Sequence, residues 1–173
     1  LGTSINEAIV FVHNCLVGIN KRDDIRIIAS GKVATGYDML TKISLGADMC
    51  NAARAMMFAL GCIQSLHCNT NRCPTGVTTQ NPLRWKMLDV SDKHVRVANY
   101  HKATVKSFLE LVGAMGVSTV HGLHPGLIQR YVDVGVSKTY AEIYPQINSG
   151  GLLGKNIPSE YKDDWKLAKA SGF

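Results

Sequence analysis

Two short apolar runs, each followed directly by a turn and a helical pattern, constrain the fold of this chain of 173 residues more than any other feature. The first run, residues 25–29, is β-branched and typical of a buried strand, and a helix is expected from about Thr35. The second run, residues 47–51, precedes a helix expected over residues 53–60. Strand, turn and helix repeated with such short connections favour a parallel α/β barrel or a doubly wound sheet.

Only these two strands are apparent, whereas a (β/α)₈ barrel needs eight strands and about 250 residues. We therefore expect an α/β fold that is the C-terminal part of a (β/α)₈ TIM barrel, with its last strands and helices present and its front missing. The segments expected are residues 1–61 as C-terminal βα units, 62–82 as a long loop, 83–148 as a helical extension and 149–173 as a flexible, loosely packed charged tail. A loop of that length in a compact domain is usually functional.

Helical spacing dominates the rest of the chain. A first helix is expected over residues 4–20, with Thr3 or Ser4 capping its start. A long helix capped by Ser91 is expected to end at Gly116. Two further short helices are expected over residues 127–132 and 140–144.

Charge and composition exclude several classes of partner. The chain has 19 Lys and Arg against 13 Asp and Glu, a net charge of +6 that affects encounters with anions but not the fold. The basic residues are scattered without interleaved aromatics, so we expect no nucleic-acid platform. Since no segment approaches about 20 unbroken apolar residues and no basic leader is visible at the start, we expect neither a membrane partner nor secretion.

Three of the five cysteines, Cys62, Cys68 and Cys73, lie within twelve positions. An odd number of clustered cysteines argues against a disulfide framework and indicates a reducing, cytoplasmic location. Thiolates bind soft metals and iron–sulfur clusters, and a loop with these gaps could wrap three sulfurs around one inorganic core. A zinc site prefers closer pairs and a fourth ligand, for which His67 is available, and Cys50 is a less favoured fourth ligand of a cluster. Three small buried thiols are the purely structural alternative, and the spacing favours the cluster.

Two turns stand where a predicted strand passes into a helix. They are Ser30, Gly31 and Lys32 after the first strand, and Asn51, Ala52, Ala53 and Arg54 after the second. A glycine lets the backbone approach a ligand closely, free N–H groups at the start of a helix attract phosphate, and Arg54 could add a charge-assisted contact. In a (β/α)₈ barrel a phosphate often binds at the loops after the last two strands. Each turn alone is also explained by a glycine or helix start with no ligand.

A set of motifs within residues 28–80 carries a family resemblance. They are Ala29-Ser30-Gly31-Lys32, Thr35-Gly36-Tyr37-Asp38, Leu45-Gly46-Ala47-Asp48, Ala59-Leu60-Gly61-Cys62, Cys73-Pro74-Thr75-Gly76-Val77 and Thr79-Gln80. With them the segment resembles the FMN-binding domain of glutamate synthases, and it looks closest to the stand-alone FMN-binding glutamate synthase-like proteins. Residues 96–101 and 140–145 also fit, so the resemblance covers about residues 1–150, and the three-cysteine spacing is its most specific element.

The resemblance implies a (β/α)₈ barrel that holds FMN, with a 3Fe–4S cluster at its side. It implies that Cys62, Cys68 and Cys73 ligate the cluster, and that backbone N–H groups at Gly31 and at residues 52–54 hold the FMN phosphate. Classic members of the family have a glycine-rich turn where this chain has residues 51–54. The backbone donors survive that difference, and the role of Arg54 is our own inference.

The chemistry implied is a redox relay that makes L-glutamate from 2-oxoglutarate and nitrogen from ammonia or glutamine. A reduced ferredoxin or a pyridine-nucleotide-linked reductase would pass electrons to the cluster, the cluster would pass them to FMN, and the flavin would give a hydride to the imine. The family's substrate contacts belong to the earlier part of the barrel, so no catalytic residue is assigned.

We accordingly expect the chain to work with the remainder of the barrel, in the same parent chain or in a partner chain, and to be inactive alone. Three alternatives stay open. One is a flavin and iron–sulfur oxidoreductase of the same family with another substrate. The others are a zinc-stabilised, non-catalytic module and a phosphate-binding barrel fragment without metal.

Overall fold

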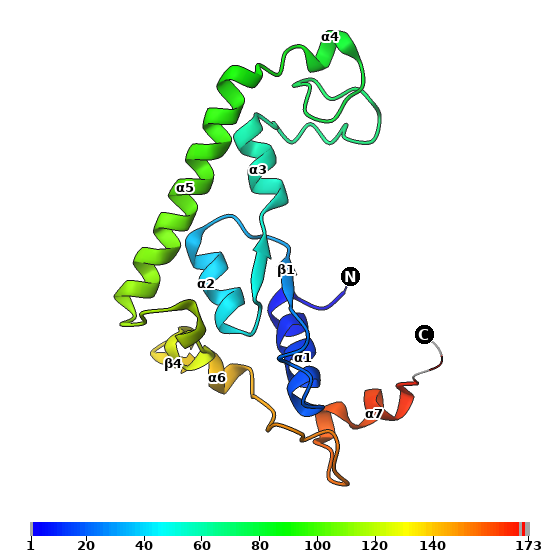
Figure 1. The fold of residues 1–173 in the computed structure, drawn as a ribbon, viewed down its shortest axis with the longest axis vertical. Helices are drawn as coiled ribbons and strands as arrows, with labels where there is room; N and C mark the ends of the chain where they lie inside the picture. The colour runs from blue at the N-terminus through cyan, green and yellow to red at the C-terminus, as the bar shows by residue number, and fades with distance from the viewer. Residues whose placement is uncertain (1, 170, 172–173) are drawn as a thin grey trace. The chain divides into compact units, whose positions relative to one another are not determined.

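The computed structural model describes residues 2–169 and 171 of the chain, and Figure 1 traces its helices and strands in chain order. The elements group into two compact units. The described parts of residues 1–28, 44–49 and 124–173 form the first unit, and residues 29–43 and 50–123 form the second. Among the described helices, none is both long enough and apolar enough to cross a membrane.

The two predicted strands are present but shorter than expected. Strands β1 (Ile28–Ser30) and β2 (Met49–Asn51) have three residues each and pair with one another as a two-stranded sheet. Both begin later than the apolar runs because Asp48 engages the residue before β1: its Oδ2 accepts the N–H of Ile27 at 2.7 Å, and its own N–H donates to the Ile27 carbonyl at 2.8 Å. Helix α2 (Gly36–Ser44) connects the two strands, so this part of the chain is an α/β fold.

Helix α2 begins with a reciprocal pair of capping contacts, and it supplies the fully buried Leu40 to the core of the second unit. The Thr35 hydroxyl accepts the N–H of Asp38 at 3.1 Å, and the Asp38 carboxylate accepts the N–H of Thr35 at 2.9 Å. Helix α3 (Ala53–Leu60) has both of its predicted ends. It stops where it does because Gly61 takes the left-handed conformation, at φ 107°, which glycine adopts without steric cost.

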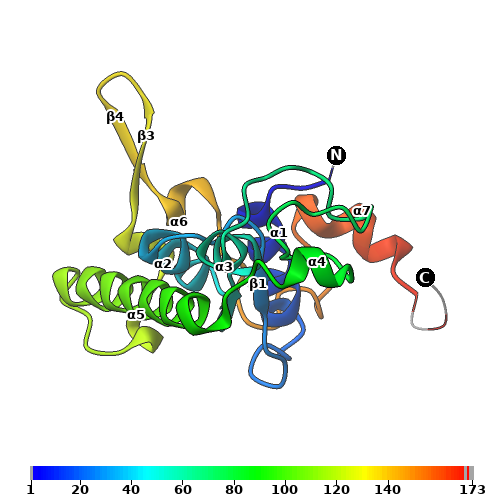
Figure 2. The ribbon, with the colours of Figure 1, turned by 90° about the horizontal axis from the view of Figure 1, so that it is seen from above.

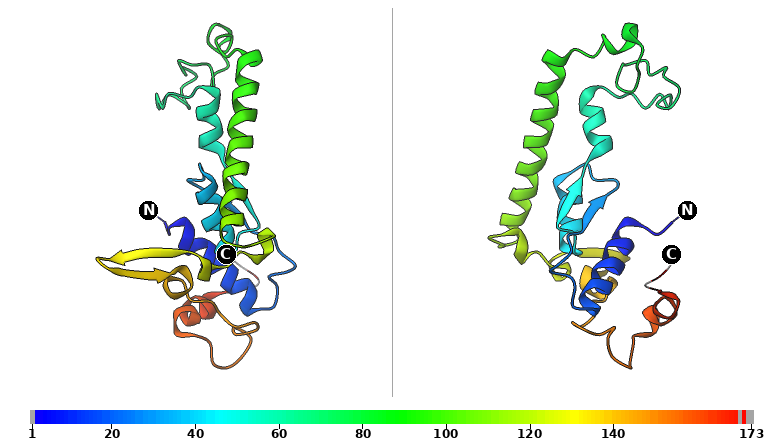
Figure 3. Two further views of the ribbon diagram at one scale, coloured as in Figure 1. Left: turned by 90° about the vertical axis from the view of Figure 1, so that its left-hand side faces the viewer. Right: turned by 45° about the vertical axis from the view of Figure 1, so that its right-hand side comes forward.

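The long helix is α5 (Val90–Ala114), which packs side by side with α3 (Figures 1 and 3). Its predicted cap is wrong by two residues, because Asp89 is the cap: the Asp89 carboxylate accepts both the N–H and the hydroxyl of Ser91. Phe108 and Val112 on this helix are buried. Between α3 and α5 lie residues 62–81, which form neither helix nor strand, and the short helix α4 (Pro82–Trp85). A 3₁₀ turn, η1 (Val120–Gly122), follows α5.

In the first unit, α1 (Ile5–Gly18) begins at the predicted cap Ser4, whose hydroxyl accepts the N–H of Glu7. The segment expected as a loosely packed tail differs from that expectation. Leu152 is 1% exposed and lies against Gly18, and the tail contains a helix, α7 (Ser159–Leu167). Its Tyr161 hydroxyl accepts a hydrogen bond at 2.8 Å from the buried Asn14, whose amide also donates to the Pro145 carbonyl. Residues 170, 172 and 173 of the tail lie outside the described residues.

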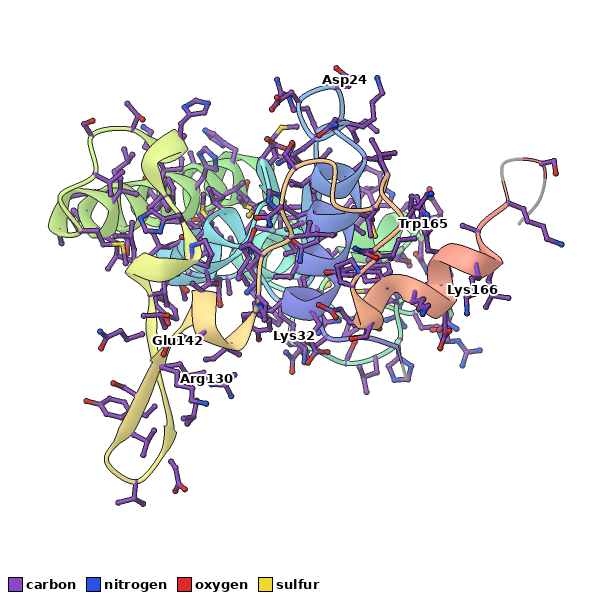
Figure 4. All side chains as sticks on the ribbon, turned by 90° about the horizontal axis from the view of Figure 1, so that it is seen from below. Asp24, Lys32, Arg130, Glu142, Trp165 and Lys166 are labelled. Carbon is purple, nitrogen blue, oxygen red and sulfur yellow. The ribbon has the colours of Figure 1, made fainter. Side chains whose placement is uncertain are left out.

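The helix predicted over residues 127–132 is wrong. After a 3₁₀ turn, η2 (Pro125–Leu127), the chain forms an antiparallel hairpin of β3 (Gln129–Asp133) and β4 (Val136–Thr139), seen as a narrow ribbon in Figure 2. The hairpin forms because Gly135, at φ 72°, permits a tight turn and the residues around it pair across the strands, with a bulge between Tyr131 and Asp133. Figure 4 shows its side chains standing out on both faces, Arg130 among them. The following helix, α6 (Tyr140–Ile143), agrees with the prediction.

Candidate functional site

The turns after β1 and β2 meet at one cavity of the second unit, with a volume of about 460 Å³. All the residues predicted to bind phosphate line it except Ala52. From the first turn these are Ser30, Gly31 and Lys32, and from the second they are Asn51, Ala53 and Arg54. Among the described residues that line it, Lys32 and Arg54 are cations and none is a carboxylate. The cavity therefore has the charge that suits an anionic ligand.

The first turn has an unusual backbone. Gly31 has φ 146°, and Lys32 has φ 52°, in the left-handed region that residues with a Cβ adopt only at a cost. Such conformations persist where surrounding contacts hold them, and they are concentrated at ligand-binding sites. Gly31 adopts its conformation freely, whereas that of Lys32 runs against the preference of the residue.

The second turn leads into the N-terminus of α3. Ala52 occupies the cap position, and an alanine side chain cannot accept the N–H groups of the first helical turn. Those backbone donors, together with the positive end of the helix dipole, therefore face the region where an anion would lie. Arg54 is the second residue of the helix and brings a guanidinium group to the same cavity.

Asp38 holds the segment that joins the first turn to α2. Its Oδ2 accepts the N–H groups of Ala34 at 3.1 Å and Thr35 at 2.9 Å, and also the Thr35 hydroxyl at 2.9 Å. Burial raises the pKa of Asp38, but these hydrogen bonds and the nearby Lys42 outweigh burial, so the pKa lies below its ordinary value. Asp38 is therefore ionised at neutral pH and holds the loop as an acceptor.

The cavity has an apolar wall that the sequence interpretation missed. Val33, Ala34, Met57 and Phe58 contribute to it. Met57 and Phe58 stand three and four residues after Arg54, so the three side chains share one face of α3. That spacing is the signal that could have identified them once Arg54 was assigned to the site.

The three cysteines of the predicted cluster occupy one irregular loop of the same unit. Cys62 follows α3 and is half-buried, Cys68 is exposed, and Cys73 is buried. Hydrogen bonds from Thr75 first, and from Thr78, lower the pKa of the Cys73 thiol to about 6 against the opposing effect of burial. Cys73 is thus mainly thiolate at neutral pH, which is the form that binds metals.

The loop does not hold these cysteines as a ready-made metal site. Within residues 2–169 and 171, no three side chains of His, Cys, Asp or Glu lie close enough together to bind a metal ion. This includes His67 and Cys50, the two further ligands considered from the sequence. Three thiols are the donors that an iron–sulfur cluster needs. The loop would have to bring them together when the cluster binds, as in proteins whose metal binding is coupled to folding.

The loop has some order of its own around Asn71. The Asn71 side-chain oxygen accepts the Thr79 hydroxyl at 2.9 Å and the Gln80 N–H at 2.6 Å. Next to these contacts is a polar cavity of about 430 Å³, to which Cys68 contributes. Arg84 of α4 ties the loop further by donating to the Arg72 carbonyl at 3.0 Å. The loop is therefore held together between Asn71 and α4.

Comparison with known proteins agrees on one family. Residues 1–118 match the model described as the conserved region in glutamate synthase. The glutamate synthase large subunit-like protein YerD of Bacillus subtilis is 37% identical over 134 residues, which are 77% of this chain and 26% of that protein. The archaeal glutamate synthase [NADPH] of Methanocaldococcus jannaschii is 36% identical over 83% of this chain and 28% of its own length. The ferredoxin-dependent glutamate synthase 2 of Synechocystis is 32% identical over 74% of this chain and 8% of its own.

Proposed function

The chain belongs to the glutamate synthase family, and from this we propose that it is the part of a glutamate synthase-type oxidoreductase that holds the FMN phosphate and a 3Fe–4S cluster. The observation that carries the proposal is the single cavity formed by the turns after β1 and β2, with Lys32 and Arg54 beside the N-terminus of α3. Two backbone turns and two cations around one space are the donors that a phosphate monoester requires.

The chain's own residues would bind the phosphate by three kinds of contact. Backbone N–H groups at the start of α3 donate to phosphate oxygens, while the Lys32 ammonium and the Arg54 guanidinium offset the charge. Gly31 allows the backbone to approach the ligand closely because it has no side chain. Met57 and Phe58 line the cavity with apolar surface, which lowers the local dielectric constant and so strengthens the ion contacts.

Cys62, Cys68 and Cys73 would hold the cluster through their thiolates. The pKa of Cys73 is lowered to about 6, so this thiol deprotonates readily and can bind as a thiolate. Cys68 is exposed and Cys62 follows directly on α3, so a bound inorganic core would draw residues 62–73 together. When bound, the cluster supplies single electrons and the flavin supplies a hydride.

The reaction proposed for the whole protein is the formation of L-glutamate from 2-oxoglutarate and nitrogen from ammonia or glutamine. The chain spans about a quarter of the length of the YerD and archaeal relatives. We propose that the remaining strands of the barrel, in the same parent chain or in a partner chain, supply the contacts to the flavin ring and to 2-oxoglutarate. Names of relatives specify ferredoxin or NADPH, which supports an electron donor of either class.

The proposed activity is tested by measuring glutamate formed by the full-length protein from 2-oxoglutarate with ammonia or glutamine. Reduced ferredoxin, or NADPH with a reductase, serves as the electron source. We expect formation of glutamate that depends on FMN and that falls below detection in Cys68→Ser. Full flavin and cluster content without any glutamate formed from either nitrogen source would contradict the reaction and favour another substrate.

A further inference from the structure

Residues 30–34 form the loop that lines the phosphate cavity, and a tyrosine on another helix holds this loop. The Tyr100 hydroxyl, on α5, donates a hydrogen bond to the carbonyl of Ala34, and Ala34 itself lines the cavity. We propose that Tyr100 is a positioning residue of the phosphate site, which fixes the shape of the wall formed by residues 30–34. This inference rests on the proposed function, since it concerns the pocket assigned there to the FMN phosphate.

The peptide at Ala34 is bound on both sides. In the peptide unit that joins Ala34 to Thr35, the N–H of Thr35 donates to the Asp38 carboxylate at 2.9 Å, within the cap of α2. The carbonyl of the same unit, that of Ala34, points the other way and accepts the Tyr100 hydroxyl. A backbone unit restrained at both its donor and its acceptor cannot rotate without losing one of the two hydrogen bonds. Asp38 alone would leave the carbonyl side unrestrained.

A second contact brings α5 close to the same loop. A Cβ placed on Gly36 would lie 2.5 Å from the backbone nitrogen of Phe108, so the start of α2 and the C-terminal part of α5 touch backbone to backbone. Tyr100 and Phe108 are eight residues apart, a little over two turns of one helix. Helix α5 therefore contacts the end of the loop that leads into α2, at the Ala34 carbonyl and at Gly36.

The same helix packs against the opposite wall of the cavity. Met56 and Leu60 of α3 line an apolar groove together with Val97 and His101 of α5. These two residues of α5 flank Tyr100 in the sequence. Helix α3 carries Arg54 and the free N–H groups, and the loop carries Lys32. Helices α3 and α5 lie side by side (Figures 1 and 3). Because α5 contacts both walls, the separation between the two phosphate-binding turns depends on how Tyr100 holds the loop.

The backbone of the loop explains why such a restraint is needed. Gly31 and Lys32 both have positive φ, and a left-handed lysine relaxes unless its neighbours hold it. Without the Tyr100 hydroxyl, the loop would sample conformations in which the two turns no longer converge on one anion. The affinity for ligands that carry a phosphate would fall, and the affinity for ligands without one would not change.

The test compares FMN with riboflavin, which lacks the phosphate, in flavin-binding titrations of the full-length protein. Tyr100→Phe removes only the hydroxyl, and we expect FMN affinity to fall about three- to tenfold, with riboflavin affinity unchanged. Hydrogen exchange should become faster at the amides of residues 31–35 and stay unchanged along α5. Tyr131→Phe is the matched control, because Tyr131 is 82% exposed on the hairpin of the other unit.

The outcomes separate the inference from the proposed function. A lower ratio of FMN to riboflavin affinity in Tyr100→Phe, with the control unchanged, supports the positioning role. An equal loss of both flavins, or no loss of either, overturns it and leaves the phosphate site standing. A wild-type protein that does not prefer FMN to riboflavin overturns the proposed phosphate site, and the role of Tyr100 with it.

Discussion

The two parts of the candidate site are prepared to very different degrees. The phosphate cavity is already shaped, since its two turns converge and its loop is held by Asp38 and Tyr100. The cysteine loop has the required thiols but does not gather them. The difference follows from the kind of donor that each part uses. Backbone N–H groups are positioned by helices and turns that form without a ligand, whereas three thiolates repel one another until a metal core offsets their charge.

The largest expected effect is on the cysteine loop. Cys68→Ser should reduce iron and acid-labile sulfide to background, because a serine hydroxyl does not supply the thiolate that the cluster needs. Flavin binding should remain, since the phosphate cavity forms independently of the loop. Cys15→Ser, on α1 in the other unit, is the matched control and should retain both cofactors. Full iron and sulfide content in Cys68→Ser would show that Cys68 is not a ligand.

The next largest effect is expected on flavin binding, with the cluster retained. Arg54→Gln should weaken FMN binding by about tenfold to a hundredfold, the loss expected for one charge-assisted contact, while cluster content stays normal. Arg84→Gln is the matched control, because Arg84 supports the cysteine loop through the Arg72 carbonyl and does not line the phosphate cavity. Equal FMN affinities in the two variants would remove Arg54 from the phosphate site.

A smaller effect is expected on the stability of the loop beside the phosphate cavity, and this effect depends on pH. Asp38→Ala should lower the free energy of unfolding by about 1 kcal/mol at neutral pH, because the Ala34 and Thr35 donors lose their acceptor. The pKa of Asp38 is lowered in the folded protein. Its contribution is therefore fully present above the ordinary pKa of 3.8 and is lost as the pH falls through the folded value.

Denaturant unfolding of wild type and variant over a range of acid pH measures this contribution. The difference between the two proteins should shrink toward zero as the pH falls. A difference that stays constant down to the lowest pH at which the protein folds would contradict an ionised Asp38 as the acceptor.

The smallest effect isolates the strain in the first turn. Lys32→Gly and Lys32→Ala both remove the cation, so both should weaken FMN binding alike. The free energy of unfolding of Lys32→Gly should nevertheless be about 1 kcal/mol higher than that of Lys32→Ala, because glycine adopts φ 52° without a Cβ clash. Chemical denaturation of the two variants side by side measures the difference. Equal stability would mean that the left-handed turn stores no strain.

Local patterns were enough to predict the elements that build the phosphate cavity. Helix α3 was bounded by a turn and by Gly61, and both signals depend only on neighbouring residues. The apolar runs located β1 and β2, but their first paired residues depend on Asp48, which no periodicity identifies. The residues of the two turns could be named because turns after successive strands meet at one edge of a sheet.

What could not be predicted depends on contacts between distant residues. The hairpin was mistaken for a helix because residues 127–132 have apolar side chains at helical spacing, and only pairing with β4 decides between the two. Leu152 and Tyr161 join the core through partners on α1 that lie more than a hundred residues earlier. Tyr100 contacts a carbonyl 66 residues before it, so its role is visible only in the folded protein.

The central claim is that one chain carries both the FMN phosphate site and the cluster loop. The most direct test quantifies flavin, iron and acid-labile sulfide in one anaerobic sample of the full-length protein, with its visible absorption spectrum. We predict FMN in equimolar amount to the protein, with iron and sulfide in the 3:4 ratio of a 3Fe–4S cluster. Zinc without sulfide, or protein that stays free of flavin and iron after anaerobic reconstitution, would contradict it.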